Sequence, residues 1–384
     1  MKVSIAAGTR PEAIKLAPVY RVVQARAGWR AHWIASGQHG EVKTRALAAL
    51  GVEPDEVLEP PPTEASVAER LSHMIARYDA ALARTGTDLL IVQGDTSTTV
   101  AAALAAFTRQ IPVAHVEAGL RTFDLTAPFP EEGWRTLVAD IAALHFAPTA
   151  AAANNLRLEG IDTGRIHVTG NTVIDALRLL GEQPKPKFLK AFANRRLITV
   201  TLHRRENWDG ALEQVAEGLR RIRARFPDVG VLFIAHVNPA LASQVKSTFA
   251  EESGVVVSDP LDYPEFVSVM RASTLILSDS GGVQEEAPAF GVPVLILRDV
   301  TERMEAVKAG VARLVGADAD AIESEATRLL ASTAAYAAMA KAVNPFGDGH
   351  ASERIVAAIS EWAAASQPVR PGRRAPAPPI RRIA

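Results

Sequence analysis

Residues 273–297, STLILSDSGGVQEEAPAFGVPVLIL, predict two buried strands joined by a glycine-containing turn and a helix. Strands joined in this way run parallel in one sheet, so the segment indicates an α/β fold. The Ser-Gly-Gly turn leaves room for a phosphate to approach the first N–H groups of the helix. Glu285 and Glu286 follow in the same helix. Acidic side chains favour the dipole at a helix start and can point away from its open N–H groups, so the two features need not conflict.

The same alternation of short apolar runs with longer amphipathic segments extends in both directions along the chain. Strands spaced by helices indicate parallel sheets covered on both faces. The runs form two series, which predicts an α/β protein with two Rossmann-like, doubly wound domains. The first series predicts strands at 2–7, 31–36, 88–93, 112–117, 144–148 and 166–170. The second predicts strands at 197–202, 229–236, 254–259, 274–279 and 292–297.

Composition limits the class of protein. The 384 residues, 48% of them hydrophobic, are enough for two domains with separate cores. A formal net charge of −1 gives no field that would favour nucleic acid or an anionic membrane. The absence of cysteine excludes disulfides, thiolate catalysis and cysteine zinc sites. The first apolar run is too short for a signal peptide, and no uncharged apolar stretch approaches ~18 residues, so we expect a cytoplasmic protein with no membrane or nucleic-acid partner.

Two segments indicate how the chain is divided. Segment 181–197 holds two prolines and several cations, and we expect it to link domains at 1–175 and 190–349. The tail, 366–384, has five prolines, five arginines and no acid, which predicts a disordered basic segment. Binding of an anion or a partner by this tail is the less favoured alternative.

Polar residues follow several predicted strands, at the sheet edge where ligands bind in parallel folds. In AAGTRPEAIKLAP, Gly8 permits a tight turn and Pro11 fits the first helical position. Backbone N–H groups there would face an anion, and Arg10 and Lys15 would add positive charge. An ordinary turn with a surface arginine explains the same residues equally well. The motif is not GxGxxG, so a nicotinamide cofactor is not indicated.

Asp95 also lies between a strand and a helix, in VQGDTSTTVAAALAAF. Taken alone, it is better explained as a helix cap that accepts from the Thr98 N–H than as a functional residue. Thr96 and Ser97 could cap the same helix.

Carboxylates gather near the next strand end, in PVAHVEAGLRTFDLTAPFPEEGWR. Glu117 closes a buried strand, and Glu131 follows in a proline-bounded loop. With Asp95 at a neighbouring strand end they would form an acid/base cluster, because crowded carboxylates raise one another's pKa values. Solvated loop charges are the alternative. A metal site is a further use of such acids, but no ligand pair at suitable spacing is found, so no metal is expected.

The second series begins with a cationic strand end. His203 follows its first strand, together with two arginines, in TLHRRENWDG, and a diphosphate needs such charge. A solvated basic turn explains these residues equally well. Glu302, in LRDVTERMEAVKAG after the last predicted strand, could hold a ribose diol or belong to a capping turn.

Over about 1–360, these segments together resemble the non-hydrolysing UDP-N-acetylglucosamine 2-epimerases. The matching motifs are GTRPEAIKLAP, QGDTSTT, HVEAGLRT, PEEGWR, TGNTVIDAL, TLHRREN, SDSGGVQEEAPAFGVPVL, TERMEAVKAG and NPFGDGHASERI. Each motif is weak alone, whereas nine in the same order are specific.

The resemblance implies a glycosyltransferase-B-like fold with the active site in the interdomain cleft. It also implies a last helix, about 350–365, that crosses back to the first domain. The implied reaction interconverts UDP-N-acetylglucosamine and UDP-N-acetylmannosamine in a homodimer without a cofactor. UDP is eliminated to give 2-acetamidoglucal and then added back with inversion at C2. This route needs an acid and a base on opposite faces of the sugar and cationic support for the departing diphosphate.

The motifs also imply residue roles. The implied catalytic residues are Asp95, Glu117, Glu131 and His203. The implied substrate-binding residues are Arg10, Lys15, Arg135, His203, Ser280, Gly281, Gly282 and Glu302. Arg10, His203 and the Ser-Gly-Gly turn are expected at the diphosphate. Glu302 is expected at the ribose, and Lys15 and Arg135 at the sugar.

The chain departs from the family pattern near the sugar. Trp134 stands where the family usually has Asn, and Met304 where it usually has Pro. A large Trp134 would reshape the sugar pocket, which leaves open a 2-epimerase for a 3-acetamido or uronic-acid UDP-sugar. A glycosyltransferase of the same fold and a non-catalytic nucleotide-sugar sensor are less favoured alternatives.

A second departure concerns an activating site that many bacterial members have between the domains. Gln38, His39 and His236 match its pattern, but Glu41 replaces its second Gln. We therefore expect weak or altered allosteric activation.

Overall fold

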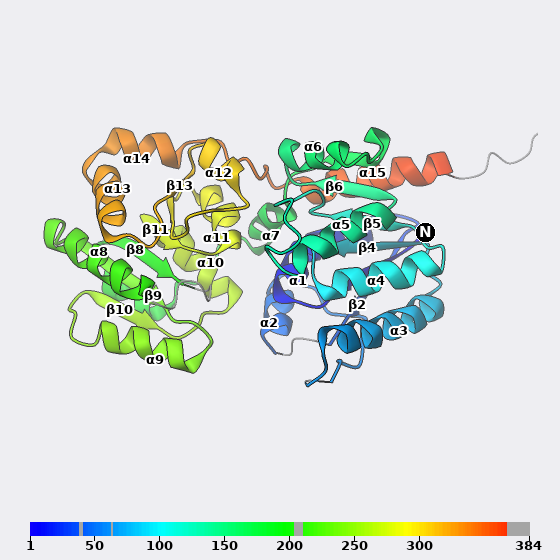
Figure 1. Cartoon of the computed structure of the whole chain (residues 1–384), viewed down its shortest axis with the longest axis horizontal. Coiled ribbons are helices and arrows are strands. Elements are labelled where there is room, and N and C mark those ends of the chain that lie inside the picture. Colours follow the sequence, from blue (N-terminus) through cyan, green and yellow to red (C-terminus); the bar gives the residue numbers. More distant parts are fainter. Residues whose placement is uncertain (38–40, 63, 203–209, 367–384) are drawn as a thin grey trace, which may run out of the picture.

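The computed structural model describes residues 1–37, 41–62, 64–202 and 210–366, which form two α/β halves side by side (Figure 1). No helix within these ranges is long and apolar enough to cross a membrane. Apart from its first residue, the predicted basic tail lies outside the described residues.

The first half contains a parallel sheet with the strand order β3-β2-β1-β4-β5-β6-β7. Its strands are β1 (Lys2–Ala7), β2 (Arg30–Ala35), β3 (Glu56–Val57), β4 (Leu89–Gln93), β5 (Val113–Val116), β6 (Leu144–Ala147) and β7 (Ile166–Val168). Its helices are α1 (Arg10–Ala25), α2 (Glu41–Ala49), α3 (Val67–Thr85), α4 (Ser97–Thr108), α5 (Glu131–Ile141), α6 (Ala150–Leu158) and α7 (Thr172–Leu180). The strand order reverses direction between β1 and β4, which opens a crevice at their carboxyl ends.

The second half repeats this architecture with the order β10-β9-β8-β11-β12-β13, again parallel. Its strands are β8 (Arg196–Thr201), β9 (Val229–Ile234), β10 (Val255–Ser258), β11 (Leu275–Ser278), β12 (Val294–Ile296) and β13 (Ala312–Leu314). Its helices are α8 (Ala211–Arg225), α9 (Pro239–Thr248), α10 (Tyr263–Ala272), α11 (Gly281–Glu286), α12 (Met304–Lys308), α13 (Ala319–Ala331) and α14 (Thr333–Ala340). Its order reverses between β8 and β11, so α11 begins at the second crevice.

The fold class predicted from the sequence is confirmed, and every predicted strand is present to within two residues at each end. The prediction missed β3 and β13, which are edge strands of two and three residues. Strands this short have no apolar run long enough to produce a periodic signal.

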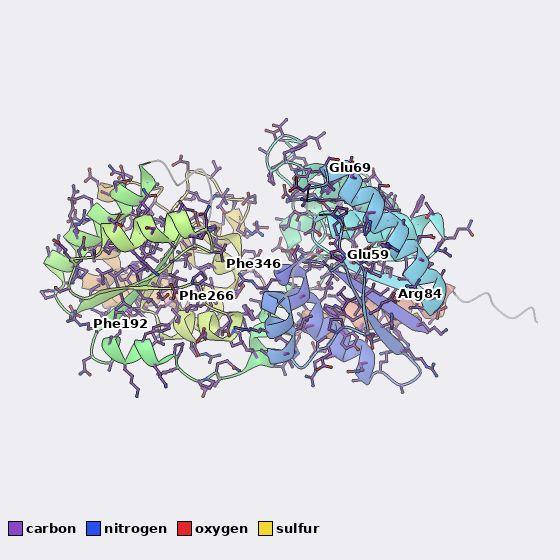
Figure 2. All side chains as sticks on the ribbon, turned by 90° about the horizontal axis from the view of Figure 1, so that it is seen from below. Glu59, Glu69, Arg84, Phe192, Phe266 and Phe346 are labelled. Carbon is purple, nitrogen blue, oxygen red and sulfur yellow. The ribbon has the colours of Figure 1, made fainter. Side chains whose placement is uncertain are left out.

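One buried apolar cluster continues from the first half into the second. It joins Val173 and Leu177 of α7 to Val267 of α10 and Val283 of α11. Phe346, which belongs to the same cluster, lies between the two halves (Figure 2). The two halves are therefore in contact through buried apolar side chains as well as across a polar cleft.

The chain passes between the halves twice. It leaves the first half after α7, and α15 (Ala351–Ser366) returns to pack against α1 and α7. Leu189 and Phe192, inside the predicted linker, are buried against the second sheet. These contacts support our proposal of domains at 1–175 and 190–349, with α15 completing the first.

A buried carboxylate in α7 fixes the start of α15. Asp175 accepts hydrogen bonds from the backbone N–H groups of Ala351, at 3.1 Å, and Ser352, at 2.7 Å. Burial raises the pKa of Asp175, while the hydrogen bonds from Ser352 oppose that rise. The returning helix is thus capped by a residue distant in the sequence.

We expect Asp175→Ala to lower the free energy of unfolding by about 1–3 kcal/mol, because it leaves two buried N–H groups without an acceptor. Urea unfolding measures the loss, and amide exchange at Ala351 and Ser352 locates it. Asp162→Ala, which removes the exposed cap on the Gly164 N–H, is the matched control and should cost less. Equal losses in the two variants would contradict this role for Asp175.

Glu286, the last residue of α11, is a second buried acid. Its burial, followed by the charge of Glu285, raises its pKa to about 8 from an ordinary value of 4.5. Between these values the folded protein holds a proton that the unfolded chain releases. The free energy of unfolding therefore falls as pH rises through this window and levels off above it.

We expect Glu286→Gln to remove this pH dependence. The free energy of unfolding of the variant, relative to that of the parent, should rise between pH 5 and 8 by up to about 1 kcal/mol per pH unit. Urea unfolding at several pH values measures the difference. Glu69→Gln on α3 (Figure 2) is the control, and its free energy of unfolding relative to the parent should be flat between pH 5 and 8. Hydrogen bonds from Ser66 lower the pKa of Glu69, so the stability that Glu69 adds is lost as pH falls. A difference for Glu286→Gln that is flat from pH 5 to 8 would contradict the assignment.

Candidate active site

A cavity of about 480 Å³ lies at the carboxyl edge of the first sheet and is closed on one side by the second half. Its lining includes residues that follow β1, β4 and β5, the start of α5, and the segment before α12. It brings together these predicted site residues: Lys15, Asp95, Glu117, Glu131, Arg135 and Glu302.

Arg10 and the Ser280–Gly282 turn are not among the residues that line this cavity. Arg10 is exposed at the start of α1, and the predicted Ser280–Gly282 turn forms the start of α11. His203 falls outside the described residues.

The predicted activating site cannot be built from the described residues, because Gln38 and His39 lie outside them. His236 borders a small hollow beside Leu202 and Phe233 that shares no lining residue with the cavity, and its Nδ1 accepts from the Asn238 N–H. Altered activation stays a prediction.

The start of α1 differs from expectation. Glu12 Oε2 accepts from the backbone N–H groups of Gly8, at 2.9 Å, and Thr9, at 2.5 Å. Its other oxygen accepts from the hydroxyls of Thr96 and Thr99. The prediction that these N–H groups would face a bound anion is therefore wrong for Gly8 and Thr9, because a capping-box glutamate already occupies them.

Asp95 is not a helix cap, contrary to the interpretation of its motif alone. Thr96 caps α4 by accepting from the Thr99 N–H at 3.2 Å. This leaves the Asp95 side chain in the cavity wall, where its Oδ2 accepts from Arg135 Nη2. Asp95 and Arg135 come from different elements and meet only in the folded chain.

Glu117 is held in a strained and well-defined position. Its φ of 62° lies in the left-handed region, which non-glycine residues occupy at a cost and which is frequent at functional sites. Three donors converge on its carboxylate: Lys15 Nζ at 2.6 Å, Asn171 Nδ2 at 3.3 Å and Gln93 Nε2. The orientation of this carboxylate is thus fixed by both backbone and neighbours.

Lys15 connects this carboxylate to the second half. Its Nζ lies 3.1 Å from Glu285 Oε2 as well as 2.6 Å from Glu117 Oε1. Burial alone would lower the pKa of Lys15, but the charges of Glu117 and Glu285 outweigh it and raise the pKa above its usual value. Lys15 is therefore an ammonium throughout the pH range in which an enzyme works.

Glu285, the first of the two glutamates after the Ser-Gly-Gly turn, pairs with a cation at that turn. Its side chain is buried, and its Oε1 accepts from Arg303 Nε at 2.9 Å. The Arg303 guanidinium lies against the start of α11, since a Cβ on Gly281 would be 3.0 Å from Arg303 Cζ. Gly281 has no side chain, which leaves room for the Arg303 guanidinium at the start of α11, and Glu285 forms an ion pair with that guanidinium.

Glu302 is held by its own neighbours. Arg298 donates to both of its oxygens, at 2.9 and 3.3 Å. Burial alone would raise the pKa of Glu302, but the Arg298 hydrogen bonds and the charge of Arg303 lower it to about 2. The cavity therefore has a permanently ionised carboxylate on the wall formed by the second half.

Trp134 does not have the effect expected from the sequence. It packs against the buried apolar cluster between α3, α4 and β4, and it is not among the residues that line the cavity. Arg135, one position later and about 100° further round α5, faces the cavity instead. The expected reshaping of the sugar pocket by Trp134 is therefore wrong.

Sequence reasoning missed several residues of this site. They are Glu12, Gln93, Asn171, Glu285 and Arg303. Each lies inside a motif quoted above, at the end of a strand, in the loop that follows it or within the next helix. That position was the only available signal.

Comparison with known proteins gives one consistent result. The family model described as UDP-N-acetylglucosamine 2-epimerase matches residues 21–360. The UDP-N-acetylglucosamine 2-epimerase of Escherichia coli K12 is 41% identical over 369 residues, which cover 94% of this chain and 98% of that protein.

Two solved structures share the fold. The UDP-GlcNAc 2-epimerase of Neisseria meningitidis, bound to UDP-GlcNAc, is 38% identical with a TM-score of 0.86, covering 94% of this chain and 100% of that one. Staphylococcus aureus MnaA, solved with UDP, is 36% identical with a TM-score of 0.87, covering 94% and 97%. With the cavity and the motifs above, these matches show that the chain belongs to the UDP-N-acetylglucosamine 2-epimerase family.

Proposed function

We propose that this protein interconverts UDP-N-acetylglucosamine and UDP-N-acetylmannosamine. The route is elimination of UDP to 2-acetamidoglucal, followed by re-addition with inversion at C2. The observation that supports it best is the convergence of Asp95, Glu117 and Glu131 on one cavity that also holds Arg303 of the second half. Family membership supports the substrate, since the Neisseria relative was solved with UDP-GlcNAc.

The chemistry accounts for the need for several carboxylates. The C2 proton of the sugar has no adjacent carbonyl to acidify it, so direct exchange is slow. In the elimination, one carboxylate takes the C2 proton, and the C–H electron pair forms the C1–C2 double bond. The C1–O pair leaves with UDP. In the return step, a UDP oxygen bonds to C1 and an acid delivers a proton to the opposite face of C2.

The two walls of the cleft divide this work. Asp95, Glu117 and Glu131 belong to the first half and form the proposed proton-transfer wall. The α11 turn with Arg303 belongs to the second half, where backbone N–H groups and a guanidinium suit a departing diphosphate. Arg10 and His203 are proposed to complete the diphosphate site, and Glu302 to hold the ribose.

Two ion pairs lie in the part of the cavity where we expect the sugar. Arg135 donates to Asp95, and Lys15 donates to Glu117. We propose that these two cations keep the carboxylates in place while the glucal is bound between them. A closed cleft would retain glucal and UDP between the two steps.

The alternative of a modified UDP-sugar as substrate rests on Trp134 in the sugar pocket. Trp134 packs against an apolar cluster and does not line the cavity, so this support is lost. A glycosyltransferase would leave the three converging carboxylates without a use. Neither alternative is favoured by a specific observation.

We expect incubation with UDP-N-acetylglucosamine in deuterated water to place deuterium at C2 and to yield the manno epimer. Proton NMR of the C2 position measures the exchange, and mass spectrometry identifies the products. Transfer of the sugar to an acceptor with no label at C2 would overturn the proposal.

We expect Asp95→Asn, Glu117→Gln and Glu131→Gln each to lower kcat by about 10²-fold or more, because each removes a proposed proton-transfer group. The affinity for UDP, measured by calorimetry, should stay within a few-fold of the parent. Asp140→Asn, an exposed change on the same helix as Glu131, is the matched control and should leave kcat unaltered. Equal losses of UDP affinity and kcat would instead show that these residues only shape the pocket.

A further inference from the structure

Asn171 uses every polar group that it has. It lies in the TGNTVIDAL motif, at the turn between β7 and α7, and is buried. Its backbone N–H donates to Phe346 O at 2.7 Å, and its Oδ1 caps α7 by accepting from the Val173 N–H at 3.0 Å. Its Nδ2 lies 3.3 Å from Glu117 Oε1 and 3.2 Å from Glu285 Oε2. One side chain thus touches a proposed catalytic carboxylate and a carboxylate of the other half.

The backbone around Asn171 is fixed to the returning chain. Gly170, with a φ of 90°, and Gly347, with a φ of 123°, lie back to back. A Cβ on Gly347 would be only 3.2 Å from Gly170 Cα, and at both positions the positive φ is one that a residue with a side chain rarely adopts. Phe346, beside this contact, lies between the two halves (Figure 2). Asn171 is therefore placed where the returning chain touches the turn before α7.

Glu285 is the matching residue in the second half. Its Oε2 lies near Lys15 Nζ as well as Asn171 Nδ2, while its Oε1 accepts from Arg303. Its backbone oxygen accepts from Asn344 Nδ2 at 3.4 Å. Glu117 and Glu285 thus share the same two donors, although they belong to different halves. Two carboxylates bridged in this way cannot move independently without leaving a buried donor unpaired, which is costly.

We propose that Asn171 and Glu285 are positioning residues for Glu117, and that through them the placement of the second half controls the geometry of that carboxylate. The inference rests on the proposed function, because it gives Asn171 and Glu285 a role in the proposed reaction. A shift of Glu285 with the second half would release Asn171 Nδ2 and Lys15 Nζ to rearrange around Glu117. Misplacement of a catalytic group by about 1 Å costs on the order of 10²-fold in rate.

The variant Asn171→Ser separates this role from simple helix capping. Serine is as good a cap as asparagine, so α7 should keep its start. Its shorter side chain cannot reach either carboxylate. We expect kcat to fall about 10- to 100-fold, while the UDP affinity and the urea midpoint stay near those of the parent.

Asn238→Ser is the matched control, because Asn238 caps α9 in the same way by accepting from the Ala240 N–H at 2.9 Å. It should leave kcat unchanged. Asn171→Asp is a second test if the serine variant folds poorly. It keeps the size and the cap acceptor but removes the donor that faces Glu117, so kcat should fall at least as far.

A double-mutant cycle with Glu285→Gln tests the coupling between the halves. If both residues act through the position of Glu117, the combined loss in kcat should be clearly smaller than the product of the single losses. A double variant whose loss in kcat equals the product of the two single losses would overturn the inference. So would a kcat for Asn171→Ser that is within twofold of the parent. Deuterium exchange at C2 by the parent separates the two failures: no exchange by the parent rejects the proposed function itself, whereas exchange with unaffected variants rejects only this positioning role.

Discussion

A buried ammonium between two carboxylates is the interaction on which the rest of the site depends. Lys15 lies within 3.1 Å of acids from both halves, Glu117 and Glu285, in a region that water hardly reaches. Removing one partner of such a buried group typically costs about 3–5 kcal/mol, because the remaining charge is left uncompensated. The two halves are therefore joined at the cleft by charge and below it by the apolar contact of α7 with α10 and α11.

The backbone prepares this arrangement before any ligand is considered. Both sheets reverse their strand order, between β1 and β4 and between β8 and β11. Lys15 in the helix after β1 contacts Glu285 in the helix after β11. Glu12 accepts hydrogen bonds from the backbone N–H groups of its own turn. The ammonium of Lys15 contacts Glu117 and Glu285. The left-handed conformation at Glu117 adds strain that the surrounding donors offset. The first half thus lines the cavity with Asp95, Glu117 and Glu131, and the second half lines it with Glu302 and Arg303.

The sequence predicted the fold better than the site. Alternating apolar and amphipathic segments are local signals, and they located both sheets except for the edge strands β3 and β13. The site depends on contacts between distant residues, such as Arg135 with Asp95 and Glu285 with Lys15. Local reasoning made Asp95 a cap, because a single segment does not reveal which neighbour will take each role. The departure from the family pattern gave Trp134 a place in the pocket, because a motif does not reveal which way a side chain packs. The family motifs identified residues of the cavity but not their partners.

The central claim is a division of labour: acids of the first half handle the sugar proton while the second half holds the detached nucleotide. A crystal structure with bound UDP tests it most directly. We expect the outer phosphate at the Ser280–Gly282 turn, with Asp95, Glu117 and Glu131 facing the space beyond it. A UDP complex in which these three side chains point away from that space would contradict the claim.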